Sequence, residues 1–138
     1  MKKHVLLVDE DVFPMKFYVK ALNKHGFNVK HIRNPDQALE FIEAEKNSVE
    51  AVILDIMLPP GETYKNIDTN NGLETGVYLL QDLRKQVDRK LPIIILTNVQ
   101  SPETLTKIQK TKYQVIAAKL EYPPYDLARL LKKLMNKE

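Results

Sequence analysis

The chain has 138 residues, 43% hydrophobic and 28% charged, which suits one globular domain. It contains no cysteine, which excludes a disulfide framework or thiolate metal site and is compatible with the reducing cytoplasm, where we expect this protein. The net charge of +3 comes from basic residues scattered along predicted helices, so it favours solvated helix faces over direct nucleic-acid binding. The first apolar run, residues 5–8, is too short for a signal peptide or a membrane span.

Short apolar runs alternate with helical patterns from the amino terminus onward, which predicts βαβ units and a parallel sheet. Residues 5–8 form the first predicted strand, and the first helix begins near Phe13 and ends before Gly26. A second strand covers residues 27–32. Asn34 then caps a second helix, with proline at its first position and a buried stripe formed by Ala38, Leu39, Phe41 and Ile42.

The middle of the chain carries a third predicted strand, residues 51–54, followed by a polar, turn-rich segment. We expect the insertion at residues 60–71 to be mobile and to lie at the rim of the site described below. A third helix begins at Leu73, and Gly76 allows its close approach to a neighbour. Its apolar face is predicted to consist of Leu73, Val77, Leu80 and Leu83.

The carboxyl-terminal part follows the same alternation of strand and helix. A fourth strand covers residues 93–96, and Ser101 caps a fourth helix that has proline and glutamate in its first turn. A fifth strand covers residues 115–118, and Asp126 caps a last helix. Five strands and five helices predict a single α/β domain over residues 1–138, a flavodoxin-like doubly wound parallel sheet of order 2-1-3-4-5.

Polar residues follow four of the predicted strands directly. Asp9 and Glu10 follow the first strand, Asp55 the third, Thr97 the fourth and Lys119 the fifth. In a doubly wound sheet, ligands bind at the carboxyl ends of the strands, at the switch point between the first and third strands. Carboxylates that meet there favour a hard divalent cation, and the added hydroxyl and ammonium suit a phosphoryl group.

Four segments resemble the signature segments of response-regulator receiver domains in two-component signalling: residues 5–11 (VLLVDED), 51–59 (AVILDIMLP), 92–97 (PIIILT) and Lys119. The resemblance implies that Asp55 is the phosphoacceptor. It also implies that an acidic pair organises Mg²⁺ and that a conserved hydroxyl and lysine complete the site; at the matching positions stand Asp9, Glu10, Thr97 and Lys119.

The chemistry of such a site assigns a role to each group. Asp55 attacks phosphorus as an oxygen nucleophile, Thr97 donates a hydrogen bond to a phosphoryl oxygen, and Lys119 neutralises charge. Mg²⁺ takes few direct carboxylates, so Asp9, Asp55 and a backbone carbonyl near Met57 suffice as direct ligands. Glu10 acts through water.

The resemblance also implies a mode of signalling. The expected phosphodonor is a sensor histidine kinase or a phosphotransfer protein, and the expected output is contact with a downstream protein, because no output domain is expected in residues 1–138. No direct contact with nucleic acid or a membrane is expected. The protein would phosphorylate and dephosphorylate itself rather than act as a turnover enzyme.

Two alternatives remain open from the sequence. Glu10 stands where a second aspartate is commoner, Asn98 where a small residue is usual and Ile116 where the family has a switch aromatic, so a phosphorylation-independent interaction module is the main alternative. A haloacid-dehalogenase-like phosphatase is the other, since residues 9–11 have the spacing of its nucleophile and acid. That reading lacks the further acidic motif that such enzymes need after Lys119, and it leaves Asp55 without a role.

Overall fold

The computed structural model describes residues 3–99 and 101–136, which form a five-stranded parallel sheet in the order β2-β1-β3-β4-β5. Apolar runs form the three central strands, whereas the outer strand β2 has a lysine and a histidine at its two middle positions. The crossover segments return every strand in the same direction. The predicted flavodoxin-like fold and strand order are confirmed. The strands are β1 (His4–Val8), β2 (Val29–Ile32), β3 (Val49–Leu54), β4 (Ile93–Thr97) and β5 (Gln114–Ala118).

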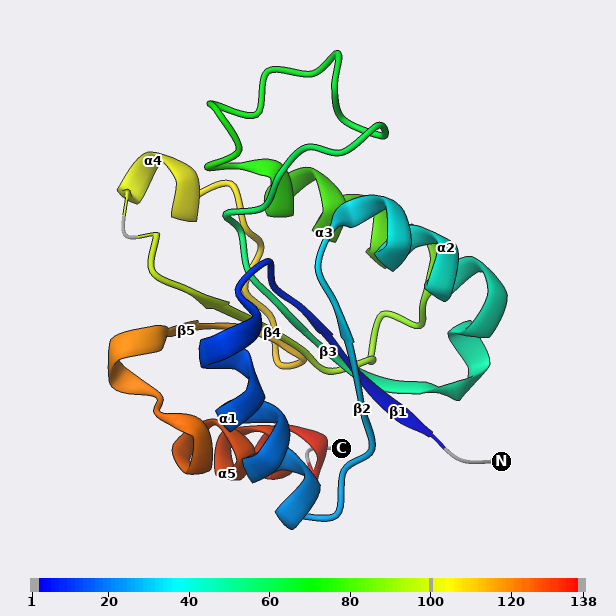
Figure 1. Cartoon of the computed structure of the whole chain (residues 1–138), viewed down its shortest axis with the longest axis vertical. Helices are drawn as coiled ribbons and strands as arrows, with labels where there is room; N and C mark the ends of the chain where they lie inside the picture. Colours follow the sequence, from blue (N-terminus) through cyan, green and yellow to red (C-terminus); the bar gives the residue numbers. More distant parts are fainter. Residues whose placement is uncertain (1–2, 100, 137–138) are drawn as a thin grey trace.

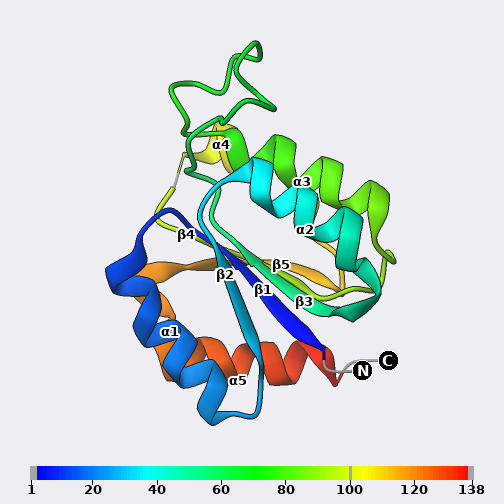
Figure 2. The same ribbon diagram turned by 45° about the vertical axis from the view of Figure 1, so that its right-hand side comes forward.

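Helices cover both faces of the sheet (Figures 1 and 2). α1 and α5 pack on one face, and α2 and α3 pack on the other. Within the described ranges, no helix is long and apolar enough to span a bilayer. The helices are α1 (Val12–Lys24), α2 (Pro35–Glu45), α3 (Thr75–Gln86), α4 (Pro102–Leu105) and α5 (Pro124–Met135), with short 3₁₀ turns at Lys46–Ser48 and Lys119–Glu121.

The central strands divide the hydrophobic core into two halves. In β1, Leu6 and Val8 face α2 and α3, whereas Val5 and Leu7 face α1 and α5. All four side chains are buried, because successive residues of a strand point to opposite faces and both faces are covered. This two-sided burial holds the ends of β1 and β3 in place, and with them the residues that follow.

Several predicted boundaries are wrong by a few residues. α3 begins at Thr75 rather than Leu73, because Glu74, with a φ of −122°, is not yet helical. Leu73 lies in the turn that follows the positive φ of Gly72 (+86°), and 39% of its surface is exposed. α5 begins at Pro124, so Asp126 lies in its first turn rather than at its cap. The side chain of Ser101 makes no capping hydrogen bond.

The insertion at residues 60–71 is attached to two helices (Figure 1 shows it in green). The Tyr64 side chain is only 2% exposed, and its hydroxyl donates a hydrogen bond of 2.5 Å to Asp82 of α3. The Asp36 carboxylate of α2 accepts the backbone N–H of Thr63 at 2.9 Å and also its hydroxyl. No local pattern in the sequence indicates these partners, because they lie far apart along the chain, and the mobility of the insertion stays a prediction.

Gly76 is where α3 passes closest to the end of β3. Its N–H donates to the Ile56 carbonyl at 2.7 Å, and an added Cβ would lie 2.4 Å from the carbonyl oxygen of Asp55 and from the Ile56 Cα. Because both neighbours are backbone atoms, we expect Gly76→Ala to lower the free energy of unfolding by about 2 to 3 kcal/mol. Urea unfolding measures this loss.

Gly26→Ala is the matched control. Gly26 has a φ of +90° but open space around its Cβ position, so only backbone strain opposes the substitution. That strain costs about 1 kcal/mol. Equal losses in the two variants would show that α3 does not depend on contact at Gly76.

Candidate functional site

Two buried aspartates lie at the ends of neighbouring strands. Asp9 follows β1 and Asp55 follows β3, and the register pairs the last residues of these strands, Val8 and Leu54. The Asp55 N–H donates to the Val8 carbonyl at 2.9 Å, which extends the ladder to the site. Asp9 is 2% exposed and Asp55 7%. The sheet, rather than a flexible loop, therefore sets the spacing of the two carboxylates.

Lys119 joins these aspartates from the end of β5. Its Nζ lies 2.8 Å from Oδ2 of Asp9 and 2.9 Å from Oδ2 of Asp55, and its side chain is only 12% exposed. Two ionised carboxylates and one ammonium leave a net negative charge in a poorly solvated place. The group can therefore accept a further cation, and either carboxylate can offer an oxygen as a nucleophile.

Burial and ion pairing act in opposite directions on this cluster. Burial raises the pKa of Asp9 above 3.8, and the hydrogen bonds from Lys119 and the Asp11 N–H offset only part of that rise. Burial lowers the pKa of Lys119. Attraction to Asp55 and hydrogen bonds to both aspartates raise this pKa by more than burial lowers it, so the net pKa lies above 10.5. The ammonium therefore stays charged at neutral pH, and ionised Asp9 is a costly group that a cation relieves.

Backbone N–H groups hold the other oxygen of each carboxylate. The Asp11 N–H donates to Oδ1 of Asp9 at 2.9 Å, and the Met57 N–H donates to Oδ1 of Asp55 at 3.2 Å. Thr97 at the end of β4 is 1% exposed, and its hydroxyl oxygen accepts the Val99 N–H at 3.1 Å. The hydroxyl proton of Thr97 is thus free to be donated.

Glu10 is the one candidate side chain that the fold does not bury with the others. It is exposed, and its backbone carbonyl accepts a hydrogen bond of 3.0 Å from Arg33 Nε. Across residues 3–99 and 101–136, no three acidic, histidine or cysteine side chains are grouped to hold a metal. The cluster thus offers two carboxylates, Asp9 and Asp55, and a water-mediated role of Glu10 stays a prediction.

Two contacts were missed by sequence reasoning, one at the site and one between the segments that follow β3 and β4. His31 of β2 contacts the Asp9 carbonyl through Nε2 at 2.9 Å, and nothing in its local pattern signalled this. The buried Glu74, just before α3, accepts the Thr104 hydroxyl at 2.7 Å and Lys107 Nζ at 2.9 Å. This second contact joins α3 to α4, and only a non-local pairing could have revealed it.

A scan against family models matches residues 5–134 to the response regulator receiver domain. Among solved structures, the chain is similar to the BeF₃-activated N-terminal receiver domain of Klebsiella pneumoniae RstA, with 27% identity and a TM-score of 0.69. The comparison covers 98% of this chain and 100% of that one. A search of curated proteins finds no significant match.

Two further structures share the fold at lower identity. A response regulator receiver protein from Pseudomonas putida has a TM-score of 0.72 at 21% identity, covering 100% of this chain and 98% of that one. One from Sinorhizobium medicae has a TM-score of 0.74 at 18% identity, covering 98% and 95%. These two likenesses concern the fold alone.

Proposed function

Because the chain belongs to the family of response regulator receiver domains, we propose that it accepts a phosphoryl group on Asp55 in two-component signalling. The observation that carries this proposal is the contact of one ammonium, Lys119 Nζ, with both buried aspartates, at 2.8 Å to Asp9 and 2.9 Å to Asp55. Asp55 is the more exposed of the two, so it is the better placed to reach a phosphodonor.

The reaction follows from the positions of three side chains. An Asp55 oxygen forms a bond to phosphorus while the bond from phosphorus to the donor, a phosphohistidine or a small acyl phosphate, breaks and the donor keeps that electron pair. Lys119 exchanges part of its contact with the carboxylates for the phosphoryl oxygens. The Thr97 hydroxyl donates a hydrogen bond to one of those oxygens.

The acidic pair fits Mg²⁺, because it supplies hard oxygen donors and a net negative charge. Asp9 and Asp55 would bind the ion directly with a backbone carbonyl near Met57, and Glu10 would act through water. When bound, Mg²⁺ supplies neutralisation of charge on the phosphoryl group. Among the described residues the site offers two buried carboxylates rather than three acidic ligands. Two suffice for Mg²⁺, because this ion keeps several of its waters.

We expect incubation with acetyl phosphate and Mg²⁺ to add one phosphoryl group, measured as a shift of intact mass. The reaction needs the cation because the site carries excess negative charge before the phosphoryl group arrives. Chelation of divalent ions should therefore prevent the shift. A chain that gains no mass with Mg²⁺ present would instead support the alternative, an interaction module that works without phosphate.

Thr97→Ala is expected to separate phosphorylation from its conformational consequence. Loss of the hydroxyl removes one hydrogen bond to the phosphoryl group, so Asp55 stays modifiable while the response of residues 98–125 weakens. Amide chemical shifts with and without a phosphate analogue measure that response. Thr97→Ser keeps the hydroxyl and should retain it. A full response in Thr97→Ala would remove Thr97 from the switch.

Exposed apolar side chains flank the site and supply a surface for the phosphodonor protein. Phe13, near the start of α1, is 66% exposed, and Leu120, directly after Lys119, is 85% exposed. Both residues follow a site residue closely along the chain, Asp9 and Lys119 respectively, so a protein that reaches the site can bury them. We place the histidine kinase or phosphotransfer protein here, and the downstream protein on the face formed by α4, β5 and α5.

A further inference from the structure

A cavity of about 800 Å³ lies beside α3, at the amino ends of β4 and β5 and away from Asp9 and Asp55. It exists because α4 is one turn of four residues, so coil rather than helix leads over this part of the sheet to β5 (Figure 1). We call this cavity the α3 groove. The residues used below line it: Val77, Leu80, Arg84, Arg89, Lys90 and Lys112.

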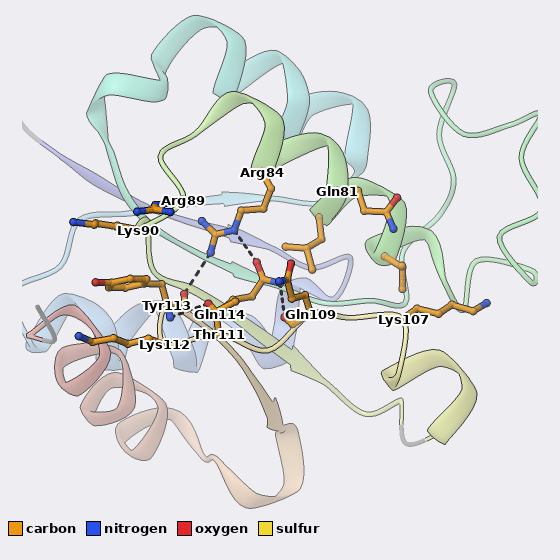
Figure 3. A pocket seen from close by; sticks show the side chains of 12 residues that line it. Gln81, Arg84, Arg89, Lys90, Lys107, Gln109, Thr111, Lys112, Tyr113 and Gln114 are labelled. Carbon is orange, nitrogen blue, oxygen red and sulfur yellow. Dashed lines mark hydrogen bonds between the residues drawn. The ribbon is translucent and has the colours of Figure 1, made fainter.

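The side chains that line the α3 groove are strongly basic. Five of them are lysine or arginine, and none is acidic. Figure 3 shows Arg89, Lys90 and Lys112 at the left of the view, with Tyr113 between Lys112 and the other two. These three side chains are exposed and pair with no acidic residue of the described ranges. Lys107 differs, since Glu74 holds it. The free charges therefore gather at one end of the groove.

Arg84 places a further cation in the wall, partly removed from water. Its guanidinium donates to Oε1 of Gln114 at 2.7 Å and to the carbonyls of Asp88 and Tyr113 at 3.1 and 3.4 Å, all neutral acceptors. Burial lowers the pKa of Arg84, and the charge of Asp88 only partly opposes this. A half-buried cation with neutral partners gains from an approaching anion.

The floor of the groove is aliphatic, which selects among anions. Val77 and Leu80 form it, each 4% exposed. Tyr113 is the one aromatic residue in the lining, and Lys112 Nζ already lies 5.7 Å from its ring centroid. Proteins that bind single-stranded nucleic acid without sequence preference stack successive bases on aromatic side chains, and one tyrosine offers little room for that. Aliphatic floor and cationic rim together suit a peptide with an apolar anchor and carboxylates.

We propose that the α3 groove binds an acidic segment of a partner protein. The segment sets an aliphatic side chain over Val77 and Leu80 and places carboxylates against Arg89, Lys90 and Lys112. The site is separate from the phosphoacceptor, and its charges are present in the unmodified chain. Binding should therefore occur without phosphorylation, and it should weaken as ionic strength rises, because the exposed cations are screened.

The test begins with selection of peptides from a phage-displayed library of random linear sequences on the full, unphosphorylated chain. The selected consensus should combine aspartate or glutamate with leucine, isoleucine or valine. Fluorescence anisotropy then measures the affinity of that synthetic peptide for the wild-type chain and for a triple variant, Arg89→Ala, Lys90→Ala and Lys112→Ala. We expect about tenfold weaker binding in the triple variant or more.

The matched control removes three exposed lysines from α1 and α5 instead: Lys20→Ala, Lys132→Ala and Lys133→Ala. It changes the net charge equally, and it should keep wild-type affinity. All substituted side chains are exposed, and thermal unfolding checks that both variants remain folded. Failure to select acidic peptides, or equal losses in both triple variants, would overturn the proposal. Tighter binding of a single-stranded oligonucleotide, lost only in the groove variant, would assign the groove to nucleic acid instead.

Discussion

Asp55→Asn is expected to be phosphorylated by acetyl phosphate at least about a thousandfold more slowly than the wild type. The amide lacks the charged oxygen that attacks phosphorus. Asparagine has nearly the same shape, so the Met57 N–H keeps an acceptor at the same place. Intact mass over time measures the rate, and unfolding by urea checks the fold.

Asp11→Asn is the matched control for Asp55→Asn. It removes the same charge two residues after Asp9, but the Asp11 side chain is exposed and only its backbone N–H meets the site. Its rate should stay within about twofold of the wild type, because an exposed charge is screened. If Asp55→Asn still gained the phosphoryl group, the nucleophile would be another residue.

Lys119→Met is expected to lower the free energy of unfolding by about 3 kcal/mol at neutral pH. The substitution keeps a side chain of similar length but leaves Asp9 and Asp55 buried without their shared ammonium. Lys20→Met removes an exposed, distant lysine of α1, and it should change stability by less than about 0.5 kcal/mol.

The pH dependence of Lys119→Met identifies the cause of its instability. Without the ammonium, the pKa of Asp9 rises beyond the rise that burial already produces above 3.8. A raised pKa in the folded state stabilises the fold at pH below the unfolded value and loses that contribution as pH rises through the folded value. The variant should therefore regain stability as the pH falls from neutral toward 3.8. Mg²⁺ at neutral pH should stabilise the variant more than it stabilises the wild type.

An equal deficit at acid and neutral pH would attribute the loss to packing of the lysine stem rather than to the carboxylates. No gain with Mg²⁺ would show that the two acids do not bind the ion.

Much of the site was predictable because a parallel sheet converts sequence position into spatial position. A strand that is buried on both faces is followed by polar residues where it leaves the sheet, and the carboxyl ends of parallel strands lie along the same side. Asp9, Asp55 and Lys119 were therefore expected to meet. The alternation predicts a doubly wound sheet, and the flavodoxin-like strand order then places the switch point between the first and third strands. Glu10 was harder to place, since the turn after β1 directs its side chain to solvent.

Features set by contacts between distant segments were not predictable. Tyr64 reaches Asp82 of α3, and Glu74 reaches α4, through pairings that leave no local pattern. The brevity of α4 was also unforeseen, because Ser101 and the proline after it look like the start of a full helix. The α3 groove is a consequence of that brevity, so the sequence alone could not reveal it.

Locating the modified residue tests the central claim most directly. After incubation with acetyl phosphate and Mg²⁺, borohydride reduces an acyl phosphate but not a free carboxylate, and it converts the modified aspartate to homoserine. Peptide mapping by mass spectrometry then finds the residue. We predict homoserine at position 55 and unreduced aspartate at position 9. Homoserine at position 9, or no reduced residue in a chain that has gained mass, would contradict the assignment of Asp55 as the phosphoacceptor.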